Sequence, residues 1–160
     1  MMLETFLLLL PAGIANMVPP LFSRVRFLDI PVNEKLFGAH KTYRGFFFGL
    51  LFSVVAVYLE SVFGYVGYGG NLVVFGLVLG LGALLGDLVE SFVKRRLGIK
   101  AGKALYVFDQ IDWIIGGLIA LSFFVDVSVS LVVESLILFG LLHVIVKIIG
   151  YLMKINEELI

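Results

Sequence analysis

The chain has 160 residues, of which 61% are hydrophobic and only 15% are charged, and its formal net charge is zero. Soluble globular domains are about half apolar and about a quarter charged, so this composition excludes an ordinary soluble domain. The chain has no cysteine, which excludes a disulfide framework and thiol chemistry.

Five long apolar segments follow one another, at about residues 3–22, 46–63, 71–92, 111–125 and 129–152. A helix needs about 17–25 residues to cross a hydrocarbon core of about 30 Å, so the short fourth segment would borrow residues from its flanks. Backbone polar groups must be paired inside a bilayer, and the segments are continuous runs without the alternation of barrel strands. The sequence therefore predicts an all-α integral membrane protein, a single domain over 1–160 with five transmembrane helices.

The positions of lysine and arginine predict the orientation of these helices. All twelve lie in the connections 23–45 and 93–110 or toward the C-terminal end, and the connections near 64–70 and 126–128 have none. The positive-inside rule places such basic loops in the cytosol. We therefore expect a multi-pass protein of the cell membrane with its N-terminus outside, both long loops in the cytosol and a cytosolic C-terminus.

The first segment and the loop after it carry several polar residues. Pro19 and Pro20 predict that the first helix ends or bends there. Asn16 is either a site residue or a partner in a hydrogen bond between helices. The second helix is directly preceded by Lys41, Thr42 and Arg44, a trio that with the following glycine suits a phosphate cradle. We interpret the adjacent histidine, residue 40, as an interfacial residue.

The third segment contains glycines four residues apart, Gly76 with Gly80 and Gly82 with Gly86. The run "GLGALLG" superficially resembles a nucleotide-binding glycine loop, but that motif requires a preceding strand. Small residues at this spacing instead favour close packing between membrane helices. We therefore predict that these glycines are helix contacts.

Polar residues form one stripe at the end of the same segment: Asp87, Glu90, Ser91 and Lys94 lie at i, i+3, i+4 and i+7. Ionised side chains are costly at membrane depth and normally face a cavity or a partner. Glu90 is also in position for a structural ion pair with Lys94 one turn later. Both interpretations of Glu90 stay open.

The fourth segment begins with Asp109 and Asp112, which share one helix face. Carboxylates also cap helix N-termini, which explains one aspartate better than two. Because the third and fourth helices are consecutive and antiparallel, both pairs of carboxylates reach the same cytosolic level. The sequence thus predicts an acidic site at that face of the membrane.

A basic loop, "KRRLGIKAGK" (94–103), separates the two acidic pairs. Carboxylates bind hard cations such as Mg²⁺, which leave coordination positions for phosphate oxygens, while lysine and arginine neutralise phosphate charge. Together they indicate phosphoryl or nucleotidyl transfer to a lipid. A basic cluster alone would also fit simple binding of lipid headgroups.

Three stretches carry a family resemblance: "GDLVESFVKRR" from Gly86, "FDQID" at 108–112 and "HKTYRG" from His40. Together they resemble the cytidylyltransferase signature of the CDP-diacylglycerol synthases, and the nearly full-length pattern resembles the archaeal branch, the CDP-archaeol synthases. The chain departs from the bacterial and eukaryotic signature, because no acidic residue follows Lys100 and no His-Gly-Gly precedes the final acids. It is also much shorter than those enzymes.

The resemblance implies a Mg²⁺-dependent reaction in which the phosphate of a prenylated glycerol phosphate lipid attacks the α-phosphate of CTP, giving CDP-lipid and pyrophosphate. It implies that lipid tails enter sideways from the bilayer and that CTP arrives from the cytosol. The implied metal ligands, or holders of metal-bound phosphates, are Asp87, Asp109 and Asp112. The implied contacts to CTP phosphates are Ser91, Lys94, Arg95 and Lys100, with Lys41, Thr42 and Arg44 completing the polar cavity.

Other functions remain as alternatives. A small transporter with an intramembrane acidic site would need no CTP, although no inverted repeat is seen in the sequence. A CDP-alcohol phosphotransferase would carry Asp-x-x-Asp-Gly, whereas Trp113 follows Asp112 here. A structural membrane subunit would not need carboxylates that converge. We expect no nucleic-acid partner, and the oligomeric state stays open.

Overall fold

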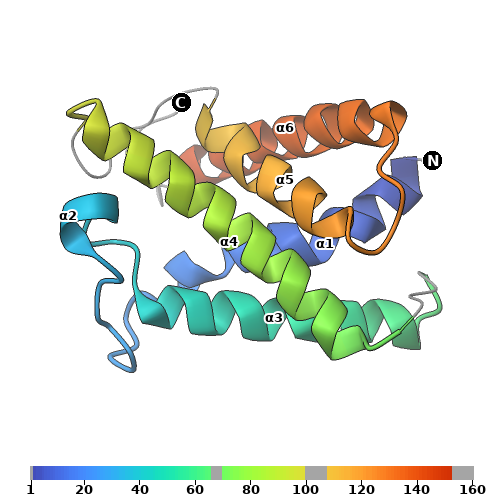
Figure 1. The fold of residues 1–160 in the computed structure, drawn as a ribbon, viewed down its shortest axis with the longest axis horizontal. Coiled ribbons are helices and arrows are strands. Elements are labelled where there is room, and N and C mark those ends of the chain that lie inside the picture. The colour runs from blue at the N-terminus through green and yellow to red at the C-terminus, as the bar shows by residue number, and fades with distance from the viewer. Residues whose placement is uncertain (1, 66–69, 100–107, 153–160) are drawn as a thin grey trace.

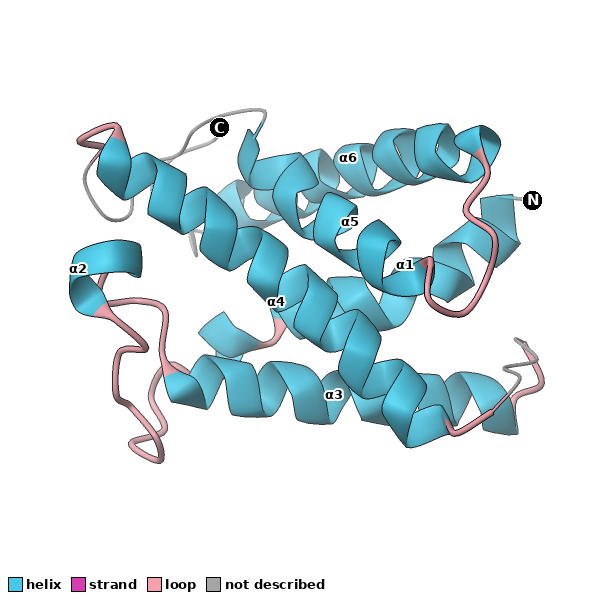
Figure 2. Ribbon diagram, viewed as in Figure 1, coloured by secondary structure: helices cyan, strands magenta, loops and turns pink. Residues whose placement is uncertain are grey.

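The computed structural model describes residues 2–65, 70–99 and 108–152, and these ranges contain helices but no strand, apart from an isolated antiparallel bridge between Pro31 and Thr42. The predicted all-α class is confirmed (Figures 1 and 2). In chain order the elements are α1 (Met2–Met17), the 3-10 helix η1 (Pro19–Phe22), α2 (Glu34–Phe37), α3 (Tyr43–Val62), α4 (Leu72–Arg96), α5 (Phe108–Leu121) and α6 (Val129–Leu152).

Polar residues cap three of the long helices at their N-termini. The side chains of Thr42, Asn71 and Ser128 each accept a hydrogen bond from the backbone N–H three residues later, at 3.2 Å in all three cases. Such caps satisfy N–H groups that have no partner within the helix. The C-terminal end of α1 is Met17, two residues before Pro19, as the two prolines predicted.

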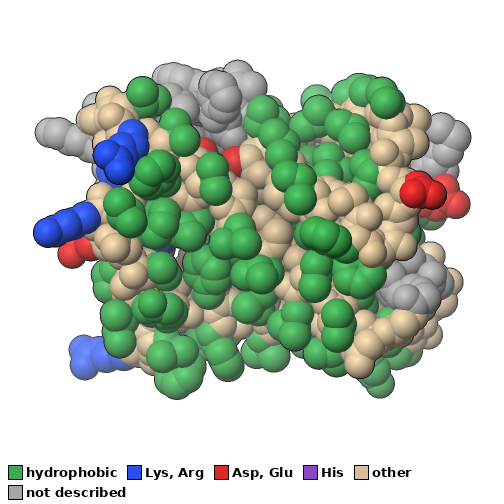
Figure 3. Space-filling view, in the orientation of Figure 1, with side chains coloured by type: hydrophobic (Ala, Val, Ile, Leu, Met, Phe, Trp, Pro, Cys, Tyr) green, Lys and Arg blue, Asp and Glu red, His purple; other side chains and the backbone are tan. Residues whose placement is uncertain are grey.

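The length and polarity of the helices suit a membrane. Within the described residues, three helices are long and apolar enough to cross one: α1 together with η1, α3 and α4. Shorter apolar stretches at 110–121 and 129–142 belong to α5 and α6. The helix of the fourth apolar segment ends at Leu121, because residues 122–125 form the turn toward α6. Hydrophobic side chains cover the middle of the face drawn in Figure 3, and lysine and arginine gather at the end where α2 and the C-terminal end of α4 lie.

The helix α4 crosses α3 and α1 obliquely and packs closely against α5 (Figure 1). Its glycines allow this close packing, as predicted. A Cβ atom at Gly76 would lie 2.7 Å from the Cα of Val54, and one at Gly80 would lie 2.9 Å from the Cβ of Ser53, both on α3. The Ser53 hydroxyl also donates to the carbonyl of Gly76 at 2.8 Å.

The core lies where α1, α4 and α5 meet. Leu9, Leu79, Ile114 and Leu121 are fully buried there. Burying such side chains between helices gives the dense packing that holds membrane bundles together, since lipid tails are as apolar as the core itself. The described polar residues of the site lie at one end of this bundle, beside the loop 23–42.

Candidate active site

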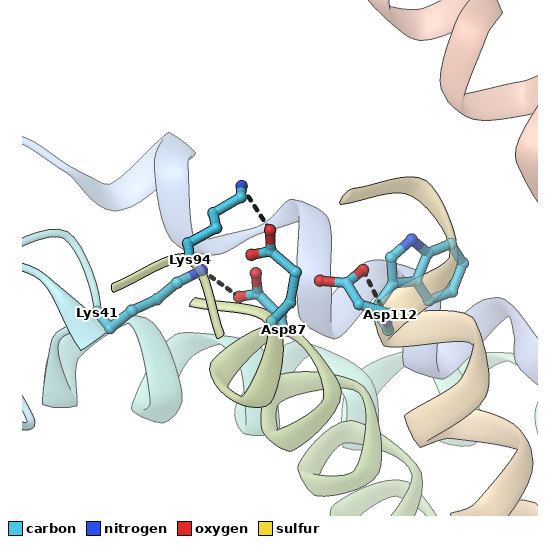
Figure 4. A network of polar contacts seen from close by, with 6 residues as sticks. Lys41, Asp87, Lys94 and Asp112 are labelled. Carbon is cyan, nitrogen blue, oxygen red and sulfur yellow. Dashed lines mark hydrogen bonds and ion pairs between the residues drawn. The ribbon is translucent and has the colours of Figure 1, made fainter. Parts of the chain in front are cut away.

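Three carboxylates come together where α4 and α5 cross. Asp87 and Glu90 belong to α4 and Asp112 to α5, and one oxygen of each lies within 4.8 Å of the others. In Figure 4 the Asp112 carboxylate faces Asp87, whose own carboxylate is turned toward Lys41. The convergence predicted from the two antiparallel helices is present for these three residues.

Glycines at the crossing of the two helices bring Asp112 close to α4. A Cβ atom at Gly86 would collide with the carbonyl oxygen of Asp112, and one at Gly82 would lie 2.5 Å from the carbonyl oxygen of Gly116. Only glycine permits backbones to approach so closely. Because Gly86 directly precedes Asp87, the contact that joins the helices also places the two aspartates beside each other.

Each acid on α4 has a lysine partner (Figure 4). Lys41, in the loop before α3, donates to Asp87 Oδ2. The Lys94 ammonium lies 2.6 Å from Glu90 Oε1, with side-chain exposures of 10% and 7%. Of the two interpretations of Glu90 left open by the sequence, the i,i+4 ion pair forms, and Glu90 lies in the carboxylate cluster as well. Asp112 accepts a hydrogen bond from the backbone N–H of Trp113 at 2.6 Å.

Thr42 and Arg44, two of the predicted phosphate-binding residues, hold the loop before α3 in place. Thr42 is buried and caps α3, as described above. Arg44 Nη1 donates to the carbonyl oxygen of Val25 at 2.6 Å and lies 2.7 Å from Asp29 Oδ1. The loop is thereby tied to the start of α3 in the register that lets Lys41 reach Asp87.

A polar cavity of about 580 Å³ adjoins this arrangement. The ends of α1 and η1, the loop before α3 and the start of α3 form its walls, and Leu84 and Asp87 of α4 close it. Its polar lining residues include Asn16, Asp29, His40, Lys41, Thr42 and Arg44. Asn16, whose role the sequence left open, and His40, interpreted from the sequence as an interfacial residue, therefore both line the same space.

An apolar groove of about 560 Å³ lies on the other side of the cluster, between α4 and α5. It is lined by Gly82, Gly86 and Gly116, where the two backbones meet, and by the carboxylates of Glu90 and Asp112. Its apolar lining is formed by Val78, Leu81, Leu85, Val89, Val93, Ile111, Ile115, Ile119, Ala120 and Phe123. The carboxylate cluster thus lies between a polar cavity and an apolar groove, an arrangement that periodicity in the sequence does not reveal.

The remaining predicted residues are placed as follows. Ser91 is buried on α4, and Arg95 is half-buried one turn further along the helix. Asp109 falls in the first turn of α5, one turn before Asp112, but its side chain lies outside the described residues. Lys100 also lies outside them. Their predicted contacts with metal or nucleotide therefore stay predictions.

Comparison with known proteins agrees with this geometry. A family model described as CarS-like, CDP-archaeol synthase, matches residues 1–159. The chain belongs to this family. The family resemblance seen in the sequence is thereby confirmed, over nearly the full length of the chain.

Similar members of the family come from several archaea. The chain is 37% identical to a CDP-archaeol synthase of Methanopyrus kandleri over 93% of this chain and 88% of the relative. It is 33% identical to one of Methanosarcina barkeri over 94% and 99% of the two chains. A solved structure described as an intramembrane enzyme for archaeal membrane lipids biosynthesis has a TM-score of 0.79 and 33% identity, covering 92% of this chain and 95% of its own.

Proposed function

We propose that this protein transfers the cytidylyl group of CTP to the phosphate of a prenylated glycerol phosphate lipid at the carboxylate cluster, with Mg²⁺ as cofactor. The family consists of CTP-utilising membrane cytidylyltransferases of archaeal lipid synthesis. The observation that carries the proposal is the position of Asp87, Glu90 and Asp112 between a polar cavity and an apolar groove. A site of this kind suits a reaction between a nucleotide and a lipid.

The donor set suits a magnesium ion. Mg²⁺ binds oxygen ligands at about 2.0–2.1 Å, so two opposite ligands are about 4.2 Å apart, close to the 4.8 Å within which the three carboxylates lie here. Asp87 and Asp112 would hold the ion with Asp109 as predicted from the sequence, and the geometry adds Glu90. When bound, the metal would neutralise phosphate charge and stabilise the negative charge that builds on the leaving pyrophosphate.

Lys41 and Lys94 balance the charge of the cluster in this structure. When all three carboxylates are ionised, the two ammonium groups leave one negative charge, which favours a cation. A triphosphate brings its own negative charge, so both lysines then exchange carboxylate oxygens for phosphate oxygens as their partners. Arg95 and Lys100 add positive charge from the end of α4 and the loop that follows it.

The reaction requires positioning more than proton transfer. An ionised oxygen of the lipid phosphate attacks the α-phosphorus of CTP, a new P–O bond forms, and the bond between the α- and β-phosphates breaks to release pyrophosphate. Because the attacking oxygen is already deprotonated, no general base is needed. Holding the two phosphates in line and neutralising their charge then supplies most of the rate enhancement.

The orientation of the protein follows from its basic end. Arg24, Arg26, Lys35 and Arg96 are exposed near the loop 23–42 and the C-terminal end of α4. The positive-inside rule places this end in the cytosol, where CTP is available. In the proposed topology α5 and α6 also cross the membrane, which makes five spans with the N-terminus outside.

One assay tests the proposal. Purified protein in detergent is given α-labelled CTP, a prenylated glycerol phosphate and Mg²⁺, and we expect labelled CDP-lipid together with one pyrophosphate per turnover. Omitting the lipid should abolish both products. Correctly folded protein that forms neither product would refute the proposal and leave the transporter alternative, which requires no CTP.

A further inference from the structure

The segment 21–30, which leads from the end of η1 toward α2, exposes large apolar side chains. Leu21, Phe27 and Ile30 are 77%, 54% and 60% exposed, and the arginines between them, Arg24 and Arg26, are exposed as well. Exposed apolar groups bordered by charge mark surfaces that bind a protein or a membrane. None of these five residues lines the polar cavity or the apolar groove, so the two spaces beside the carboxylate cluster do not account for them.

The backbone holds this segment in one conformation. Leu28 has a φ of 51°, in the left-handed region that glycine adopts freely and leucine avoids. Its carbonyl oxygen accepts a hydrogen bond from the backbone N–H of Arg44 at 2.8 Å, and the carbonyl oxygen of Ile30 accepts one from Tyr43 at 3.0 Å. The segment is therefore fixed to the start of α3. A partner at the surface would explain why this strained position carries an apolar side chain that is 38% exposed.

The segment lies beside the first turns of α3, one of the helices that can cross a membrane (Figure 1). The ring of Phe27 meets the ring of Phe47 edge-on at a centroid distance of 5.4 Å. Phe47 lies about 6 Å along α3 from Tyr43, at a rise of about 1.5 Å per residue. Amphipathic elements at membrane surfaces lie about 5–10 Å into the boundary between headgroups and acyl chains. With the start of α3 at headgroup level, Phe27 reaches that boundary.

The two arginines of the segment are available for a charged partner. Asp29, the acid of the segment, is paired with Arg44 at 2.7 Å. Among the described residues, neither Arg24 nor Arg26 has a side-chain hydrogen bond or an ion pair. A guanidinium binds phosphate through paired N–H groups, and basic residues next to a membrane span attract anionic lipids.

We propose that the segment 21–30 inserts into the membrane boundary at the basic end of the bundle and binds the phosphate groups of anionic lipids through Arg24 and Arg26. The apolar side chains of the segment then contact the upper parts of the acyl chains. This site binds lipids of the surrounding membrane and not the acceptor that reacts, so it goes beyond the proposed function. The bound lipids hold the outer edge of the loop whose other end places Lys41 at Asp87.

Spin labels test the insertion. The chain has no cysteine, so Phe27→Cys and Lys35→Cys each give a single labelling site, and both positions are exposed. In liposomes of phosphatidylcholine and phosphatidylglycerol, we expect the label at position 27 to be accessible to oxygen, which concentrates in the acyl region, and protected from a water-soluble nickel chelate. The label at position 35, on α2, should show the reverse. Equal accessibility to nickel at the two positions would refute the insertion.

Lipid selectivity tests the arginines. The fractions of spin-labelled phosphatidylglycerol and phosphatidylcholine immobilised by the protein give its preference for the anionic lipid. One basic residue near an anionic surface changes binding about fivefold at low salt. We therefore expect Arg26→Gln to lower the preference, Arg24→Gln/Arg26→Gln to abolish it, and Lys35→Gln, which removes the same charge from α2, to leave it unchanged. A preference that persists in the double variant, with wild-type thermal stability, would overturn the arginine site.

Inorganic phosphate distinguishes a lipid headgroup from a soluble anion. At constant ionic strength, millimolar phosphate should not displace phosphatidylglycerol, because the acyl chains also hold the lipid. Displacement would overturn the proposal in favour of a soluble anion. None of these measurements uses CTP, so their failure would leave the proposed function standing, and absence of turnover with CTP would leave this lipid site standing.

Discussion

Replacing Gly86 by alanine tests whether the close crossing of α4 and α5 positions the carboxylates. The new Cβ atom would collide with the carbonyl oxygen of Asp112 and lie 3.0 Å from its carbonyl carbon and 3.3 Å from the Cα of Gly116. All three are backbone atoms of a helix, so none can rotate away as a side-chain tip would. The two helices must therefore move apart.

The size of the effect follows from the contact. Overpacking a well-packed interface costs about 1–3 kcal/mol, and we expect Gly86→Ala to lower the free energy of unfolding by that amount. A displacement of about 1 Å between reacting groups can reduce turnover about a hundredfold. Separation of Asp112 from Asp87 by such a distance should therefore lower kcat about a hundredfold, more than the loss of stability alone would explain.

Gly140 on α6 provides the control, because a Cβ atom there would meet no heavy atom of the described residues within 4 Å. Gly140→Ala removes the conformational cost of a helical glycine and should stabilise the protein by about 0.5–1 kcal/mol without changing turnover. Thermal unfolding in detergent and the CDP-lipid assay measure both variants. Wild-type stability and kcat in Gly86→Ala would refute the positioning role of the glycine contact.

Three further substitutions address the site. Asp112→Asn should lower kcat about a hundredfold or more, since a metal supplies several kcal/mol of charge stabilisation. The affinity for Mn²⁺, measured by electron paramagnetic resonance, should fall in the same variant. An unchanged affinity would show that Asp112 is not a metal ligand. Lys41→Met frees Asp87 from its ion pair, so Mn²⁺ should bind more tightly in the absence of nucleotide. KM for CTP should rise, because a lysine partner of the phosphates is lost. Weaker Mn²⁺ binding would contradict the proposal that Lys41 moves from Asp87 to a phosphate oxygen. Arg44→Ala removes charge-assisted hydrogen bonds worth about 1.5–3 kcal/mol, so trypsin should cleave the loop 23–33 at least tenfold faster. An unchanged cleavage rate would show that Arg44 does not hold the loop.

The helices and one part of the site were predictable because they depend on local spacing. Asp87 and Glu90 share a helix face by their i,i+3 separation, and consecutive antiparallel helices meet at one level, so the approach of Asp112 followed from topology. The glycine pairs on α4 were predictable for the same reason, since residues four apart lie on one face. Whether the cluster binds metal stays a prediction.

Contacts between distant segments were not predictable from periodicity. Lys41 and Asp87 are 46 residues apart, and their pairing depends on the course of the loop before α3. The basic trio suggested phosphate binding, but it did not indicate that Arg44 contacts Val25 and Asp29. The apolar groove was not predictable for another reason. Its residues look like ordinary lipid-facing or packing positions, and they line one space only because α4 and α5 pack side by side.

The residues around Gly86 combine a close contact between two helices with a cluster of charged side chains, and the cluster depends on the contact. Ionised side chains at membrane depth cost a few kcal/mol each unless they are paired. Here the cost of Asp87 and Glu90 is offset by Lys41 and Lys94, one from a distant loop and one from the next turn of the same helix. Asp112 arrives only because Gly86 has no side chain. We therefore expect a bulkier residue at position 86 to move Asp112 away from the two paired acids and so to weaken the proposed cation site.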